Sequence, residues 1–160
     1  MIYRLLFLTK CGLESIILIK LMSFTFRLVK RSMAKLIVAK EFDFSAAHRL
    51  IKYKGKCENL HGHNYRLIVK VLGNPDEDGM VIDFTELKSI VKKEALDTLD
   101  HAYINDILEQ PTAENISIWI WDKIETKLKK SNCRLFEVEV WESPQSKVIY
   151  NGIKESDISL

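Results

Sequence analysis

Alternating apolar and polar positions predict strands in four parts of this chain. In the first part, residues 36–48, the side chains of one parity are Leu36, Val38, Phe42, Phe44, Ala46 and His48. The segment 65–71 is rich in β-branched and aromatic residues, and this second strand is expected to reach about residue 72. Two more strands are predicted at 135–141, with Phe136, Val138 and Val140 facing inward, and at 148–150.

Helical spacing predicts two helices between the second and third strands. Asp83 is the expected N-cap of the first, with Glu86 in the capping-box position, and apolar residues recur to about Leu99. Thr112 is the expected cap of the second helix. The order strand, strand, helix, helix, strand, strand predicts an α+β fold, in which a four-stranded antiparallel sheet carries two helices on one face.

Charge separates a leader from the body of the chain. Residues 1–32 hold six basic residues and one acidic residue, whereas residues 33–160 hold 18 basic and 21 acidic residues. The apolar run 16–19 is interrupted by Lys20 and is too short to span a bilayer. A start codon assigned too early, a transit peptide or a signal peptide would each explain the leader. We expect Met33 to be the functional start and residues 33–160 to form a single domain.

Composition is typical of a globular protein, with 47% hydrophobic and 29% charged residues. The slightly acidic body gives no reason to expect nucleic acid or a membrane as a partner. Three cysteines at irregular spacing do not form a disulfide framework, which favours a reducing, cytoplasmic location. Cys133 lies just before a predicted strand and is expected to be inert.

Three of the four histidines are expected to converge. His61 and His63 share one face of the second strand, and His48 ends the same face of the first. If the two strands pair antiparallel, the three imidazoles form a tri-histidine site with an open fourth position, the pattern of catalytic zinc. With Cys57 as a fourth ligand the site would be a closed structural one, so a non-catalytic, zinc-stabilised binding module is the alternative.

Other polar residues add candidate chemistry. Glu142 shares the parity of an apolar face, where it either grips an N–H-bearing ligand or follows the end of the strand into solvent. Asp100 and His101 form an adjacent acid–imidazole pair. Cys57 is a candidate base or nucleophile, and Glu58 is either a surface residue or a second carboxylate near the metal.

Six short motifs, in order, resemble the 6-pyruvoyl-tetrahydropterin synthase and 6-carboxytetrahydropterin synthase family. The similarity covers about residues 35–151, and the motifs together are highly specific. They are Phe44-Ser45-Ala46-Ala47-His48-Arg49-Leu50, Cys57 with His61-Gly62-His63-Asn64-Tyr65, Val81-Ile82-Asp83-Phe84, Leu99-Asp100-His101, Pro111-Thr112-Ala113-Glu114-Asn115 and Val140-Trp141-Glu142.

The resemblance implies a T-fold whose subunits close their sheets into a barrel, commonly as a homo-hexamer with shared active sites. It implies zinc held by His48, His61 and His63, and Cys57 as the proton acceptor. Asp100 and His101 would reach the site from a neighbouring subunit. The substrate would be a pterin, 7,8-dihydroneopterin triphosphate, anchored by Glu142, with Thr112 and Glu58 as further substrate contacts.

The spacing from Cys57 to His61 resembles the 6-carboxytetrahydropterin synthase branch of the queuosine (7-deazaguanine) pathway. This branch cleaves the substrate to 6-carboxy-5,6,7,8-tetrahydropterin, acetaldehyde and triphosphate. Glu58 departs from it, since a glutamate there resembles members that make 6-hydroxymethyldihydropterin for folate. A 6-pyruvoyl-tetrahydropterin synthase activity is the other alternative.

Overall fold

The structure, a computed structural model, describes residues 19–20, 22, 34–52 and 58–153. The chain divides into two compact units, residues 1–34 and residues 35–160. In the first unit, residues 19, 20 and 22 are helical and exposed, and the rest of this unit except Ala34 lies outside the described residues. No helix in the described part of the chain has the length and apolar character needed to cross a membrane.

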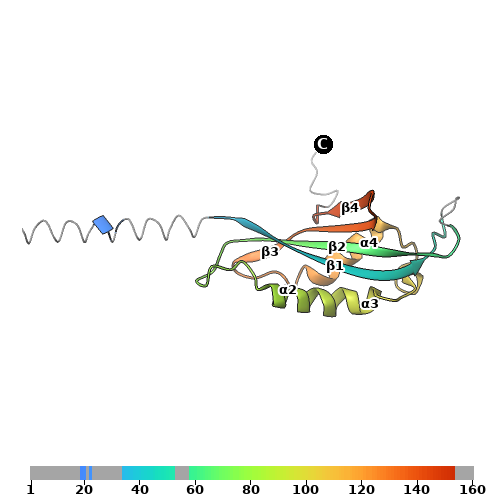
Figure 1. Cartoon of the computed structure of the whole chain (residues 1–160), viewed down its shortest axis with the longest axis horizontal. Helices are drawn as coiled ribbons and strands as arrows, with labels where there is room; N and C mark the ends of the chain where they lie inside the picture. Colours follow the sequence, from blue (N-terminus) through green and yellow to red (C-terminus); the bar gives the residue numbers. More distant parts are fainter. Residues whose placement is uncertain (1–18, 21, 23–33, 53–57, 154–160) are drawn as a thin grey trace, which may run out of the picture. The chain divides into compact units, whose positions relative to one another are not determined.

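The second unit contains one antiparallel sheet in the order β1-β2-β3-β4 (Figure 1). Its strands are β1 (Leu36–His48), β2 (His61–Gly73), β3 (Cys133–Ser143) and β4 (Ser146–Tyr150). Each strand pairs with the next along the chain. The predicted four-stranded antiparallel sheet is therefore confirmed.

The predicted helices are also present. The first runs as α2 (Phe84–Val91), a π-helical turn η2 (Lys92–Leu96) and α3 (Asp97–Leu99). The Asp83 carboxylate caps α2 by accepting from two backbone N–H groups, those of residues 85 and 86. The 3₁₀ turn η3 (Ile104–Asp106) follows, and Thr112 caps α4 (Ala113–Ile124) by accepting from the Asn115 N–H.

One face of the sheet and the helices share a single hydrophobic core. Alternate residues of β1 and β2 bury their side chains there, and Tyr65 and Leu67 are fully buried. The helices contribute Leu87, Ile116 and Ile120 to the same cluster. Figure 1 shows α2 and α3 running along one side of the sheet. The opposite, outer face of the sheet carries charged residues such as Glu41, Arg66 and Glu139, together with exposed apolar residues such as Ile37 and Ile149.

A β-bulge corrects the predicted pattern in β3. The sheet pairs Lys70 with Glu137 and Val71 with Leu135, so that Phe136 is the extra residue. Phe136 is half-buried and lies outside the core cluster, whereas Leu135 is 2% exposed within it. The prediction that Phe136 faces inward was therefore wrong, because strict alternation does not account for a bulge.

A charge cluster lies on the outer face, centred on Glu139. This carboxylate is only 4% exposed, and it pairs with Lys147 at 2.8 Å and with Lys70. The Trp141 indole N–H also donates to it, at 3.2 Å. Burial alone would raise the pKa of Glu139, but the hydrogen bonds from the two lysines outweigh it and lower the pKa to about 2.

This cluster predicts an acid-dependent loss of stability. Because its folded-state pKa lies below the usual 4.5, Glu139 stabilises the fold fully above that pH and progressively less as the pH falls toward 2. Glu139→Gln should therefore lower the free energy of unfolding at pH 7 by about 3 kcal/mol and flatten its pH dependence below about pH 5. Urea unfolding at several pH values and one fixed protein concentration would measure both effects.

Glu41→Gln is the matched control. Glu41 also lies on the outer face and pairs with Arg66 at 2.6 Å, but both side chains are about half exposed. Water screens such a pair, so this change should alter the free energy of unfolding by less than about 1 kcal/mol. Equal losses in the two variants would contradict the account of Glu139.

Candidate metal centre

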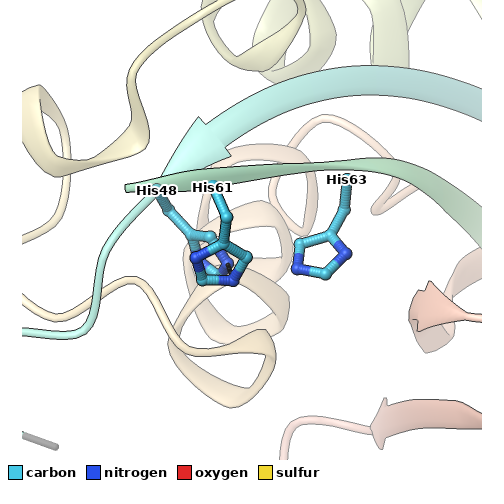
Figure 2. A group of neighbouring side chains, drawn as sticks. All are labelled: His48, His61 and His63. Atoms are coloured by element: carbon cyan, nitrogen blue, oxygen red, sulfur yellow. Dashed lines mark hydrogen bonds between the residues drawn. The ribbon is translucent and has the colours of Figure 1, made fainter. Parts of the chain in front are cut away.

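The register of β1 and β2 brings three histidines together at one end of the sheet. His48 pairs with His61, and Ala46 pairs with His63. All three imidazoles lie on the inner face, and Figure 2 shows them projecting to the same side of the two strands. One nitrogen from each ring lies within 4.8 Å of the others, so the group could hold a metal ion.

Backbone carbonyls fix the tautomers of two of these rings. His48 Nδ1 lies 2.7 Å from the Pro111 carbonyl oxygen, and His61 Nδ1 lies 2.8 Å from the Asn59 carbonyl oxygen. A carbonyl only accepts, so each Nδ1 carries the proton and each Nε2 presents a lone pair. The two Nε2 atoms face each other at 3.1 Å. Two lone pairs repel at this distance unless a cation lies between them.

The third ring supplies an unpartnered donor atom. His63 Nε2 is buried and has no hydrogen-bond partner among the residues that the structure describes. Leaving a buried polar atom unpaired is costly, and a metal ion would satisfy it. Nitrogen ligands at about 2.0–2.1 Å in a tetrahedron lie about 3.3 Å apart, close to the observed separation of the His48 and His61 nitrogens. The donor set therefore fits a metal such as zinc.

Burial keeps His48 in the form that binds a metal. The residue is 1% exposed, and burial lowers the pKa of His48 although the hydrogen bond to Pro111 acts in the opposite direction. The neutral imidazole is the ligating form. The hydrogen bond from Nδ1 also sets the plane of the ring, as is usual for metal-bound histidines.

Glu142 borders the three histidines. It lies in β3, and one carboxylate oxygen is 3.6 Å from His48 Nε2 and 3.8 Å from His63 Nε2. Its side chain is 32% exposed, so one part is in contact with the imidazoles while another remains accessible. Of the two alternatives drawn from the sequence, the structure favours the inward-facing carboxylate, since the strand continues to Ser143.

Tyr65 lies next to the histidines, and the sequence alone did not indicate a role for it at the site. Its ring stacks on Phe44 with centroids 4.8 Å apart, and its hydroxyl lies 3.4 and 3.5 Å from the two nitrogens of His48. Burial and the nearby Glu142 raise the pKa of Tyr65, so the hydroxyl stays protonated. Tyr65 therefore joins the hydrophobic core to the polar site.

Asp100 and His101 lie at the outer edge of β1 rather than beside the three histidines. Asp100 accepts from the Ser45 N–H at 3.0 Å and contacts His101 Nδ1 at 3.0 Å. The hydrogen bond from Ser45 lowers the pKa of Asp100, which keeps it ionised. His101 has φ 59°, in the left-handed region, and its side chain is 83% exposed. Within the described part of one chain, Asp100 and His101 pair with each other and with the end of β1, and neither forms a hydrogen bond or ion pair with the three histidines.

A hollow of about 380 Å³ lies beside His101. Its walls include Ser45, Ala47 and Asn64, whose places in the strands alternate with those of the inner-face residues, and it also touches their strand neighbours Ala46 and His63. The Asp100–His101 pair therefore borders the outer face of the sheet.

The other residues singled out from the sequence have no contact with the three imidazoles among the described interactions. Thr112 caps α4 and directly follows the carbonyl that holds His48. Glu58 is exposed, three residues before His61. Cys57 lies outside the described residues, so its predicted role rests on the sequence alone. Cys133 is buried, and burial raises the pKa of its thiol, as expected for an inert cysteine.

Comparison with known proteins gives one consistent result. The model of the family described as 6-pyruvoyl tetrahydropterin synthase matches residues 37–153. The 6-carboxy-5,6,7,8-tetrahydropterin synthase of Haemophilus influenzae is 39% identical over 126 residues, covering 75% of this chain and 83% of the relative. The 6-pyruvoyl tetrahydrobiopterin synthase of Dictyostelium discoideum is 42% identical, covering 68% of this chain and 90% of the relative.

The fold gives the same answer. The structure of Caenorhabditis elegans 6-pyruvoyl tetrahydropterin synthase superposes with a TM-score of 0.68 at 33% identity, covering 76% of this chain and 99% of that one. The family match extends from the second residue of β1 to the last described residue, and so includes the histidines, Glu142 and the Asp100–His101 pair. The chain therefore belongs to the 6-pyruvoyl tetrahydropterin synthase family.

Proposed function

We propose that the protein is a zinc-dependent carbon–carbon lyase acting on 7,8-dihydroneopterin triphosphate in the cytoplasm. Its products would be 6-carboxy-5,6,7,8-tetrahydropterin, acetaldehyde and triphosphate, with one water consumed, as a step of the queuosine pathway. The observation that carries the proposal is the group of three histidine nitrogens with Glu142 beside them on the same face of the sheet. Relatives named 6-carboxy-5,6,7,8-tetrahydropterin synthase support the choice of reaction.

His48, His61 and His63 would hold the zinc ion. When bound, zinc would polarise the side-chain hydroxyls of the substrate and make their protons more acidic. The chain itself orients the ligands, since Pro111 and Asn59 fix two of the imidazoles through their carbonyls. The facing Nε2 atoms of His48 and His61 and the unpartnered Nε2 of His63 are the nitrogens that would hold the ion.

Glu142 would anchor the pterin. A carboxylate can accept two parallel hydrogen bonds from adjacent N–H groups of a planar heterocycle, which fixes both position and orientation. The partly exposed Glu142 side chain leaves an oxygen available for this contact. Thr112, at the N-terminus of α4, would provide a further polar contact.

Cys57 would accept a proton from the substrate side chain, with Asp100 and His101 handling a second proton. In one chain the latter pair borders the outer face of the sheet, so we propose that it serves the site of a second copy. A homo-oligomer, commonly a hexamer in this family, would bring the two half-sites together. The exposed edges of a four-stranded sheet also favour such assembly.

The alternative functions differ from this proposal in the product that is formed. A relative at 42% identity is named 6-pyruvoyl tetrahydrobiopterin synthase, which supports a pyruvoyl product. Glu58 beside Cys57 supports 6-hydroxymethyldihydropterin. If the loop is extended, the two side chains point opposite ways and only one faces the metal. We choose Cys57, because a thiol near zinc or an imidazole has a lowered pKa.

Product analysis tests the reaction directly. Incubation of the purified full chain with 7,8-dihydroneopterin triphosphate should give 6-carboxytetrahydropterin as the main pterin by mass spectrometry. Cys57→Ala should abolish the product, because the proton acceptor is lost, and Glu58→Ala should retain most of it. If the main product is instead 6-hydroxymethyldihydropterin, and only Glu58→Ala abolishes it, the proposed reaction is wrong and the protein acts in the folate branch.

Metal binding tests the site without reference to turnover. His63→Ala should weaken the binding of zinc or cobalt to the metal-free protein by at least about 100-fold, more than the loss of an outer partner usually costs. Asn64→Ala is the matched control, since the neighbouring side chain lies on the opposite face and metal binding should be unchanged. Similar affinities in both variants would contradict the tri-histidine assignment.

X-ray absorption at the zinc edge of the wild type separates the catalytic site from a structural one. Nitrogen and oxygen ligands at about 2.0–2.1 Å are expected, with no sulfur at about 2.3 Å. Sulfur ligation by Cys57 in the resting protein would favour the non-catalytic binding module.

Mixed oligomers test whether active sites are shared. A Cys57→Ala chain and a His101→Ala chain should each be inactive alone. After random mixing of equal amounts, about one quarter of the shared sites should combine an intact Cys57 with an intact His101 from another copy and regain activity. The chains are mixed by unfolding and refolding them together, and each variant unfolded and refolded alone is the control. Absence of recovery in oligomers shown to contain both chains would argue against sharing.

A further inference from the structure

The chain that leaves β1 after His48 is held by side chains rather than by another strand. Residues 49, 51 and 52 are exposed and lie beyond the end of the β1–β2 ladder. Their backbone groups nevertheless have partners, and these come from the segment 105–110, more than 50 residues further along the chain.

Asn105 makes the first of these contacts. Its carboxamide oxygen accepts from the Arg49 N–H at 2.9 Å, and its NH₂ group donates to the Arg49 carbonyl, also at 2.9 Å. One side chain thus satisfies both backbone groups of the residue that follows His48. An amide is suited to this pairing because it offers a donor and an acceptor side by side.

Gln110 makes the second contact, with a different chemistry. Its side-chain oxygen accepts from the N–H groups of Ile51 and Lys52, at 2.9 and 3.2 Å. Its backbone carbonyl accepts from the Thr112 N–H and from the Asn115 side chain, in the first turn of α4. Gln110 therefore ties the exposed segment to the N-terminus of α4, and its side chain acts there as an acceptor.

These contacts surround His48. The ring donates from Nδ1 to the carbonyl of Pro111, the residue after Gln110, and Arg49 is the residue after His48 itself. Upstream, Ala47 donates its N–H to the Ala102 carbonyl at 3.0 Å. The end of β1 is thus joined at several points to residues 102–111, with the His48 ring between them.

We propose that Asn105 and Gln110 are positioning residues that fix the backbone after His48 against residues 102–111 and so hold its imidazole ready for the metal. This inference rests on the proposed metal site. Without the two amides, the exposed segment loses four backbone hydrogen bonds, and the Pro111 carbonyl is no longer held in place relative to the ring. His48 would then have to be ordered each time a metal binds, which weakens affinity.

The test is the affinity of the metal-free full chain for cobalt and zinc, measured by competition with a chromophoric chelator. Gln110→Leu and Asn105→Leu should each weaken binding by about 10- to 100-fold, the range typical of outer-shell partners. The visible spectrum of bound cobalt reports whether the same ligands remain.

Two charge-bearing variants separate the specific mechanism from general destabilisation. Gln110→Glu keeps an acceptor for both N–H groups, so its affinity should stay within about threefold of the wild type. Asn105→Asp loses the donor and places a carboxylate against the Arg49 carbonyl, so its affinity should fall like that of Asn105→Leu. This pair decides the question even if a leucine variant fails to fold.

Glu109→Gln is the matched control. Glu109 pairs with Lys52 at 3.1 Å and therefore touches the same segment, but both side chains are more than 70% exposed. Removing this solvated ion pair should leave metal affinity unchanged. If the wild type binds no metal, the proposed function fails. If the wild type binds but all amide variants match it, or if Asn105→Asp and Gln110→Glu behave alike, the positioning role is wrong.

Discussion

The antiparallel register between β1 and β2 is the constraint on which the candidate site depends. It pairs His48 with His61 and Ala46 with His63, so that three imidazoles emerge from one face at one end. A slip by one residue would turn the side chains of one strand to the opposite face. The same register also buries Phe44 and Tyr65 in the core. One choice of strand pairing therefore determines both the packing of the core and the grouping of the three imidazoles.

The two faces of the sheet carry different chemistry. The inner face ends in the imidazoles and Glu142, whereas the outer edge of β1 presents Asp100 and His101. A single chain thus carries two sets of reactive groups that point away from each other. This separation is the observation behind the proposal that the two sets meet only when a second copy of the chain is present.

Much of this could be predicted from the sequence, because alternation is a local property of a strand. It located the strands and the common face of the histidines, and the capping residues Asp83 and Thr112 located the starts of the two helices. The carbonyls of Asn59 and Pro111 could not be predicted, since a backbone acceptor leaves no signature in residue type. The contacts of Asn105 and Gln110 could not be predicted for a related reason. Their partners lie more than 50 residues away in the sequence, and each residue type is common in loops.

The bulge at Phe136 has a consequence for how the family can change length. Leu135 and Val138 both face the core although three positions separate them, because Phe136 absorbs one residue without shifting the strand that follows. A deletion at this point would leave Val138, Val140 and Glu142 on their present face. A deletion between Val138 and Val140 would instead turn Glu142 away from the imidazoles. A change of length at the bulge therefore leaves Glu142 beside the imidazoles, whereas a change a few residues later does not.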